Sequence, residues 1–294
     1  MKRILRAAGV PLLLLATLVM PVASGCGSDS DSSASLARER PRVDRFDSAA
    51  AYGLLREQVD MGPRPAGSRA SRRLAARLRR LLPGGRYQPV PGGLRNVVGR
   101  VPGRGQGFVV LGAHYDTKDA PGFVGANDGA SGTAVAVQLA RTIRPRTLRR
   151  TIVFVLFDGE ESPRGTPDGL FAREGLRGSK VAAPRFRDAR AMVLLDFVGD
   201  RRLRIPREGS SDKELWRRLR IAARQVGAAS AFPPETGGTL LDDHRPFLEQ
   251  GVPSIDLIDF DFDCFHRRCD NLSAVSERSL DITGETVLRL LASL

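Results

Sequence analysis

Short apolar runs that each lead to an acidic residue or a histidine constrain the fold of this chain more than any other feature. They lie at residues 108–111, 152–157, 191–195 and 255–258, and lead to His114 and Asp116, Asp158, Asp196 and His266. Continuous apolar runs are typical of strands in a sheet that is covered on both faces. Ligands of open α/β sheets bind at the carboxyl ends of such strands. We therefore expect an α/β fold in which the strand ends build one polar site.

A loop of small residues continues the first of these runs. The segment ANDGASG carries Asp128, and residues 130–141 then have the pattern of a helix. Buried carboxylates cost much free energy unless they are paired or bind a metal. Lys118 is the only lysine close to this segment in the sequence. A cluster of acids at one sheet edge therefore needs a further cation.

All three histidines of the chain lie in acidic, turn-rich segments. They are His114, His244 and His266. One isolated histidine is usually structural, but three in such segments indicate a metal site. Zinc takes imidazole and carboxylate ligands and keeps an open position when it is catalytic. The adjacent residues Glu160 and Glu161 could supply one ligand and one free general base, whereas on their own they would more simply form a solvated acidic turn.

The composition limits the partners that we expect. The chain has 294 residues, a net charge of +13 and 41% hydrophobic residues. This length suits one large α/β domain or two small ones. The arginines that carry most of the charge are dispersed, and no nucleic-acid-binding motif accompanies them, so we expect no nucleic acid partner. A basic surface near anionic lipid is the simpler interpretation.

The N-terminus predicts export. Residues 1–25 have a basic start, a short apolar core and small residues before Cys26, which is the layout of a signal peptide of the lipoprotein type. Cys26 would become the lipidated first residue, residues 26–45 a flexible tether, and residues 46–294 the catalytic domain. We expect a protein anchored by lipid to the outer face of the bacterial cytoplasmic membrane. Plain secretion, with Cys26 incidental, is the alternative.

Two further cysteines, Cys264 and Cys269, flank His266. In an exported protein such a close pair is a candidate disulfide, which would stiffen the loop around His266. Two free thiols are the alternative. Zinc ligation by both cysteines is disfavoured, because the other metal candidates are oxygen and nitrogen groups.

Several motifs, in their order and spacing, resemble the superfamily of zinc aminopeptidases and zinc-dependent glutaminyl-peptide cyclotransferases (glutaminyl cyclases). They are LGAHYDTK, FVGANDGASG, FDGEE, LLD, DDHRPFLEQGVP and the late His266. The resemblance covers roughly residues 50–294. It implies an α/β fold, a three-layer α/β/α sandwich with a mixed, mostly parallel central sheet.

The resemblance also implies roles for individual residues. Asp128 matches the central carboxylate that bridges metals. Glu161 and His266 match ligands of one zinc, and His114 and Asp196 match ligands of a second zinc in aminopeptidases. Glu160 matches the general base.

These ligands do not separate a one-zinc cyclase from a two-zinc aminopeptidase, but other positions favour a cyclase. Asp242 aligns with an active-site aspartate of cyclases, and Lys118 follows HYDT as in cyclases. Phe265 and Asp256 stand where animal cyclases have Trp and His. We expect Phe265, Lys118 and Asp256 to belong to the substrate pocket.

We therefore expect a monomeric enzyme that converts the N-terminal glutamine of peptides or proteins to pyroglutamate and releases ammonia. Zinc would polarise the side-chain amide, Glu160 would transfer the proton from the α-amine to the leaving ammonia, and Asp242 and Asp196 would hold the protonated groups. The alternative is a two-zinc aminopeptidase in which Glu160 activates water. A lipid-anchored protein that binds zinc or peptide without catalysis is a third possibility.

Overall fold

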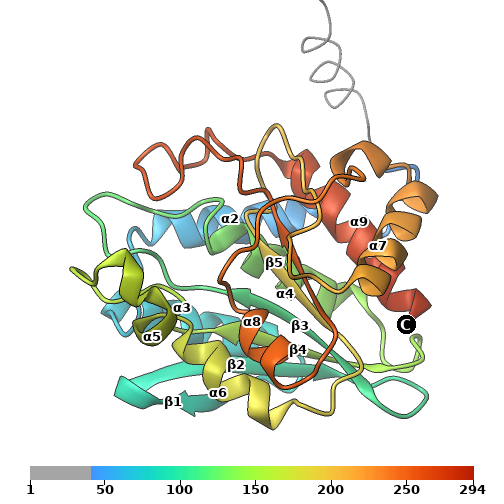
Figure 1. Cartoon of the computed structure of the whole chain (residues 1–294), viewed down its shortest axis with the longest axis horizontal. Helices are drawn as coiled ribbons and strands as arrows, with labels where there is room; N and C mark the ends of the chain where they lie inside the picture. The colour runs from blue at the N-terminus through green and yellow to red at the C-terminus, as the bar shows by residue number, and fades with distance from the viewer. Residues whose placement is uncertain (1–40) are drawn as a thin grey trace, which may run out of the picture.

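A mixed six-stranded sheet forms the centre of the computed structural model, which describes residues 41–294 (Figure 1). The strands are β1 Arg86–Val90, β2 Leu94–Val101, β3 Phe108–His114, β4 Thr151–Phe157, β5 Met192–Asp196 and β6 Ser254–Ile258. Their order is β1-β2-β4-β3-β5-β6. Strands β4, β3, β5 and β6 are parallel neighbours, and β1 and β2 are antiparallel. The predicted mixed, mostly parallel sheet is confirmed.

Helices cover both faces of this sheet. The larger core holds α2 Ser48–Asp60, α3 Arg69–Leu81, α4 Ala130–Thr142, α7 Lys213–Val226 and α9 Glu277–Ser293. The opposite face is covered by α6 Arg177–Arg185 and α8 Arg245–Glu249, with the short α5 Phe171–Glu174 beside them (Figure 1). The predicted three layers of helix, sheet and helix are therefore present.

The buried strands explain why the apolar runs are continuous. In β4, Ile152, Phe154 and Leu156 pack in the larger core, and Val153, Val155 and Phe157 pack in the smaller one. Successive side chains of a strand point to opposite faces, so a strand with a core on each side must be apolar throughout.

Polar residues at the helix starts fix where the helices begin. Ser68 accepts a hydrogen bond from the backbone N–H of Ser71 at the start of α3, and Asp212 accepts one from Leu215 at the start of α7. Such N-caps satisfy backbone donors that have no partner inside the helix. The helix predicted over residues 130–141 is confirmed as α4.

The predicted signal peptide and Cys26 lie outside the described residues. Of the predicted tether, residues 41–45 are described, and the backbone N–H of Arg42 donates to the carbonyl of Val226 at 2.7 Å. The domain boundaries stay predictions. Among residues 41–294, no helix has the length and apolar character needed to cross a membrane.

Candidate metal centre

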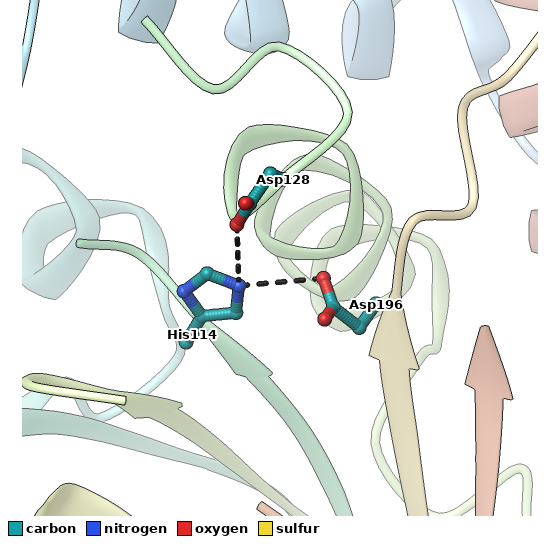
Figure 2. Close-up of side chains that lie close together, drawn as sticks. All are labelled: His114, Asp128 and Asp196. Carbon is teal, nitrogen blue, oxygen red and sulfur yellow. Dashed lines mark hydrogen bonds and ion pairs between the residues drawn. The ribbon is translucent and has the colours of Figure 1, made fainter. Parts of the chain in front are cut away.

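Two groups of ligand-type atoms share Asp128 at the carboxyl edge of the parallel strands. In the first group, Nε2 of His266 lies 2.9 Å from Oε1 of Glu161 and 3.5 Å from Oδ2 of Asp128. In the second, Nε2 of His114 lies 3.3 Å from Oδ1 of Asp128 and 3.3 Å from Oδ1 of Asp196 (Figure 2). Zinc bonds of about 2.0–2.1 Å in a tetrahedron separate ligand atoms by about 3.3 Å. Both groups have the spacing of metal ligands.

The first group fits a cation in its hydrogen bonding as well as in its spacing. Within residues 41–294, the buried Oδ2 of Asp128 and Oε1 of Glu161 have no hydrogen-bond partner. The other oxygen of Glu161 accepts a hydrogen bond from Nζ of Lys118 at 3.1 Å. Nε2 of His266 is the ion-pair partner of both oxygens. Buried carboxylate charge that one imidazole cannot balance is costly, and a bound zinc ion would remove that cost.

In the second group, both ring nitrogens of His114 have hydrogen-bond partners. Nδ1 of His114 lies 3.1 Å from the carbonyl oxygen of Asp116, and Nε2 is in hydrogen-bond geometry with Asp196. A carbonyl only accepts, so Nδ1 carries a proton. The group therefore holds together either around a metal or as an imidazolium between carboxylates.

Asp116, which the sequence places beside His114, is turned toward the backbone. Its carboxylate accepts the N–H groups of Gly159 at 2.9 Å and of Glu160 and Glu161 at 3.2 Å. Gly159 has a φ of +77°, a conformation that glycine adopts without strain. This turn after β4 places the two glutamates in the site.

Arg64 holds the loop in front of Asp128, and nothing in the sequence pattern identified it. Its guanidinium is fully buried and donates to four backbone carbonyls, those of Gln58, Gly62, Val124 and Gly125, at 2.9–3.3 Å. Burial lowers the pKa of Arg64 to about 10. These bonds tie the segment after α2 to the loop that delivers Asp128.

The loop that carries His266 is closed by a disulfide between Cys264 and Cys269. His266 has a φ of +53°, which is uncommon for a residue other than glycine and is often found at functional sites. The ring of Phe265 stacks on the imidazole with centroids 3.8 Å apart. The disulfide and the stacked ring together orient His266.

A pocket of about 320 Å³ opens over the first group. The predicted catalytic residues Glu160, Asp196 and Asp242 line it, as do Lys118 and Phe265. Its rim includes the exposed side chains of Leu241, Phe260 and Phe265.

Asp256, which we predicted to belong to the substrate pocket, does not line it. It is fully buried inside β6 and lies behind Asp242, outside the lining of the pocket. The reason is its position two residues before the end of β6, where its side chain points into the protein below the sheet edge.

The electrostatics of the pocket distinguish the neighbouring acids. Burial, and then the charge of Glu161, raises the pKa of Glu160 well above its ordinary value. Burial also opposes ionisation of Glu161, but His266 and Lys118 bring its pKa below the ordinary value. Burial raises the pKa of Asp196 to about 7, although His114 opposes the shift. Glu160 is therefore suited to carry a proton and Glu161 to stay charged.

Comparison with known proteins gives this geometry a context. The sequence profile of peptidase family M28 matches residues 96–291. The glutaminyl-peptide cyclotransferase of Bos taurus is 27% identical over an alignment of 227 positions, and the match covers 63% of this chain and 62% of that protein. Aminopeptidase YwaD of Bacillus subtilis is also 27% identical, over 61% of this chain and 39% of its own length.

The same comparison holds for solved structures. The crystal structure of an Acidobacteriales bacterium glutaminyl cyclase matches with a TM-score of 0.74 and 29% identity, over 86% of this chain and 96% of that chain. The chain thus spans about three fifths of the bovine relative's length and nearly all of the bacterial cyclase. Equal identity to a cyclase and to an aminopeptidase leaves the choice of reaction to the site.

Proposed function

The chain belongs to peptidase family M28, and from this premise we propose that it is a zinc-dependent glutaminyl-peptide cyclotransferase. Its substrates would be peptides or proteins with an N-terminal glutamine, which it would convert to pyroglutamate with release of ammonia. The likeness to the Bos taurus and Acidobacteriales bacterium cyclases supports this proposal.

Asp128, Glu161 and His266 are the residues that would hold the catalytic zinc. Oδ2 of Asp128 and Oε1 of Glu161 accept no hydrogen bond within residues 41–294 and lie close to Nε2 of His266, which supports this assignment. When bound there, zinc would polarise the side-chain amide carbonyl of the substrate glutamine.

Glu160 would carry the proton in this reaction. It lines the pocket beside Glu161 and is only 8% exposed. Its raised pKa suits a group that takes a proton from the attacking α-amine and gives it to the leaving ammonia. Asp196 and Asp242, which line the same pocket, would accept hydrogen bonds from the amine as it reacts.

One observation favours a one-zinc cyclase over a two-zinc aminopeptidase. Both ring nitrogens of His114 have hydrogen-bond acceptors, Asp116 and Asp196, so this group is satisfied without a metal. In the group around His266, Oδ2 of Asp128 and Oε1 of Glu161 accept no hydrogen bond within residues 41–294 and share the single Nε2 of His266 as their ion-pair partner. A site in which only the His266 group needs a cation supports a cyclase that uses one zinc ion. The aminopeptidase remains the second candidate, because His114, Asp128 and Asp196 also have the spacing for a second zinc.

We also propose that the protein is exported and held at the membrane by lipid on Cys26. The disulfide of Cys264 and Cys269 supports an oxidising compartment. Small residues precede Cys26, as expected of a lipoprotein signal.

A paired peptide assay tests the reaction. The zinc-loaded protein is given one peptide that begins with Gln and one that begins with Leu, and the products are followed by mass spectrometry. Loss of ammonia from the Gln peptide, with both backbones intact, is the expected result. Release of free Leu or Gln would contradict the cyclase and support the aminopeptidase.

A further inference from the structure

A third group of ligand-type side chains lies behind the pocket, beside Asp242. Atoms of Asp242, His244 and Asp256 all lie within 4.8 Å of one another. His244 and Asp256 are fully buried and Asp242 is 5% exposed. Asp242 and His244 come just before α8, and Asp256 comes from β6. The group is thus assembled by the fold from two segments.

The atoms that face each other in this group have no hydrogen-bond partner within the described part of the chain. They are Oδ2 of Asp242, Nδ1 of His244, and both Oδ1 and Oδ2 of Asp256. Nδ1 of His244 and Oδ2 of Asp256 are 3.6 Å apart, which is longer than a hydrogen bond. Leaving four such atoms buried and unpaired would be very costly.

The other side of His244 fixes which ring nitrogen carries the proton. Nε2 lies 2.9 Å from Oγ of Ser210 and 3.2 Å from Oε2 of Glu208. Glu208 is an acceptor for the Ser210 hydroxyl, the Ser211 hydroxyl and the backbone N–H of Leu240. With its own proton donated to Glu208, Ser210 accepts from Nε2–H. Nδ1 of the neutral ring then presents a lone pair to the carboxylates.

This arrangement is the one that metal-binding histidines use. A ligating imidazole usually donates its other ring N–H to a carboxylate or a similar acceptor, which fixes the orientation of the ring. Here Glu208 and Ser210 supply that support.

Protonation alone satisfies the group less well than a cation. Three carboxylates, those of Glu208, Asp242 and Asp256, surround a single imidazole, and the ion pairs seen for Glu208 and Asp256 are both with His244. An imidazolium alone would leave two negative charges uncompensated. With a second proton shared by Asp242 and Asp256 the charge would balance as well as with a divalent cation, but Nδ1 of His244 and Oδ2 of Asp256 are 3.6 Å apart, too far for the hydrogen bond that this state needs. A proton shared by Asp242 and Asp256 would leave Nδ1 of His244 without a partner.

We propose that Asp242, His244 and Asp256 bind a divalent metal cation at a site separate from the Asp128 centre. One imidazole nitrogen and the carboxylate oxygens of Asp242 and Asp256 suit zinc. Because Asp242 also lines the pocket, the cation reaches the group from there and fixes the orientation of Asp242. This inference does not depend on which reaction the enzyme catalyses.

The direct test locates the metal in crystals of the protein grown with zinc chloride. An anomalous difference map at the zinc absorption edge is expected to show a peak enclosed by Asp242, His244 and Asp256. A peak at Asp128, Glu161 and His266 checks the catalytic assignment independently. A peak at the Asp128 centre with none at His244 would overturn the third site and leave the proposed function intact.

A measurement in solution gives a second, separate test. The zinc content per chain is measured for the wild-type protein and for Asp256→Asn and His244→Gln, after dialysis against the same zinc buffer. Each variant is expected to lose about one equivalent of zinc. Asp259→Asn is the matched control, since Asp259 is a buried carboxylate just beyond β6 and outside this group. Unchanged zinc in an Asp256→Asn protein with wild-type circular dichroism would overturn the proposal.

Discussion

The carboxylate of Asp270 accepts the backbone N–H of Asp128 at 3.1 Å, across a separation of 142 residues. Its other oxygen accepts the N–H of Asn127 at 2.7 Å. Asp270 belongs to the loop that carries His266, and Asp128 is the residue shared by the two metal groups. One buried side chain therefore sets the distance between ligands that lie far apart in the sequence.

Removing this link should weaken metal binding. Asp270→Ala leaves two backbone N–H groups unpaired and frees the His266 loop, so we expect zinc affinity to fall about 10- to 100-fold, as for other residues that support metal ligands. Competition with a zinc-chelating dye measures the change. Asp270→Asn keeps one acceptor oxygen and should have a smaller effect. Equal affinities for Asp270→Ala and the wild type would contradict this role.

Glu160 and Glu161 should separate catalysis from metal binding. Glu160→Gln cannot take up the proton, so we expect the turnover of an N-terminal substrate to fall about 10²- to 10⁴-fold. Zinc content should stay at the wild-type value, because Glu161, not Glu160, belongs to the metal group. The exposed Glu249→Gln is the control. Turnover by Glu160→Gln close to the wild-type value would refute Glu160 as the base.

Sequence patterns predicted the parts of the fold that have a strong local signal. The apolar runs that became β3, β4, β5 and β6 are buried on both faces, and this leaves a continuous pattern. The antiparallel edge strand β1 was not predicted. It contains Pro89, and a proline in a short polar run argues against a strand although an edge strand tolerates it. Helix α6 was missed for a similar reason, since Pro184 lies within its last turn.

In the candidate site, too, the residues with a local sequence signal could be predicted and those without one could not. Residues at strand ends and in family-like motifs, such as Asp128 and His266, could be identified because their chemistry is visible in the sequence. Arg64 could not, because its partners are backbone carbonyls of distant segments. Asp116 was identified beside His114, but the backbone N–H groups after β4 that it binds were not. Glu208 likewise meets His244 only in the folded protein, because 36 residues separate them in the sequence. The contact of Ser210 with the same ring is also made by tertiary structure alone.

Arg64 should matter for stability more than any exposed arginine. Arg64→Ala removes the guanidinium that donates to the carbonyls of Gly62 and Val124. It also removes one of the two donors to the carbonyls of Gln58 and Gly125. We expect the free energy of unfolding to fall by about 3 kcal/mol or more, since each unsatisfied buried group costs about 1–3 kcal/mol. Urea denaturation measures this difference. Arg56→Ala, at an exposed position of α2, should change it by less than about 0.5 kcal/mol, and a similar small loss for Arg64→Ala would contradict the assignment.

Asp259 should make the stability depend on pH. It is 2% exposed, and burial, with the negative charges of Asp200 and Asp261, raises its pKa from 3.8 to about 8. Between these values the folded protein keeps a proton that the unfolded chain has lost. The free energy of unfolding therefore falls as the pH rises from about 4 to about 8, by at most about 1.4 kcal/mol per pH unit for this group.

Asp259→Asn removes this titration and should flatten the decline. Its side-chain oxygen can still accept the N–H of Arg204, which Asp259 binds at 2.7 Å, so the fold is kept. Urea denaturation at several pH values, at one fixed zinc concentration, measures the slope for both proteins. Asp263→Asn, whose side chain is 80% exposed in the wild type, should keep the wild-type slope. If Asp259→Asn also keeps it, the carboxyl group of Asp259 is ionised in the folded protein throughout this range, and its burial is compensated by the backbone N–H groups around it.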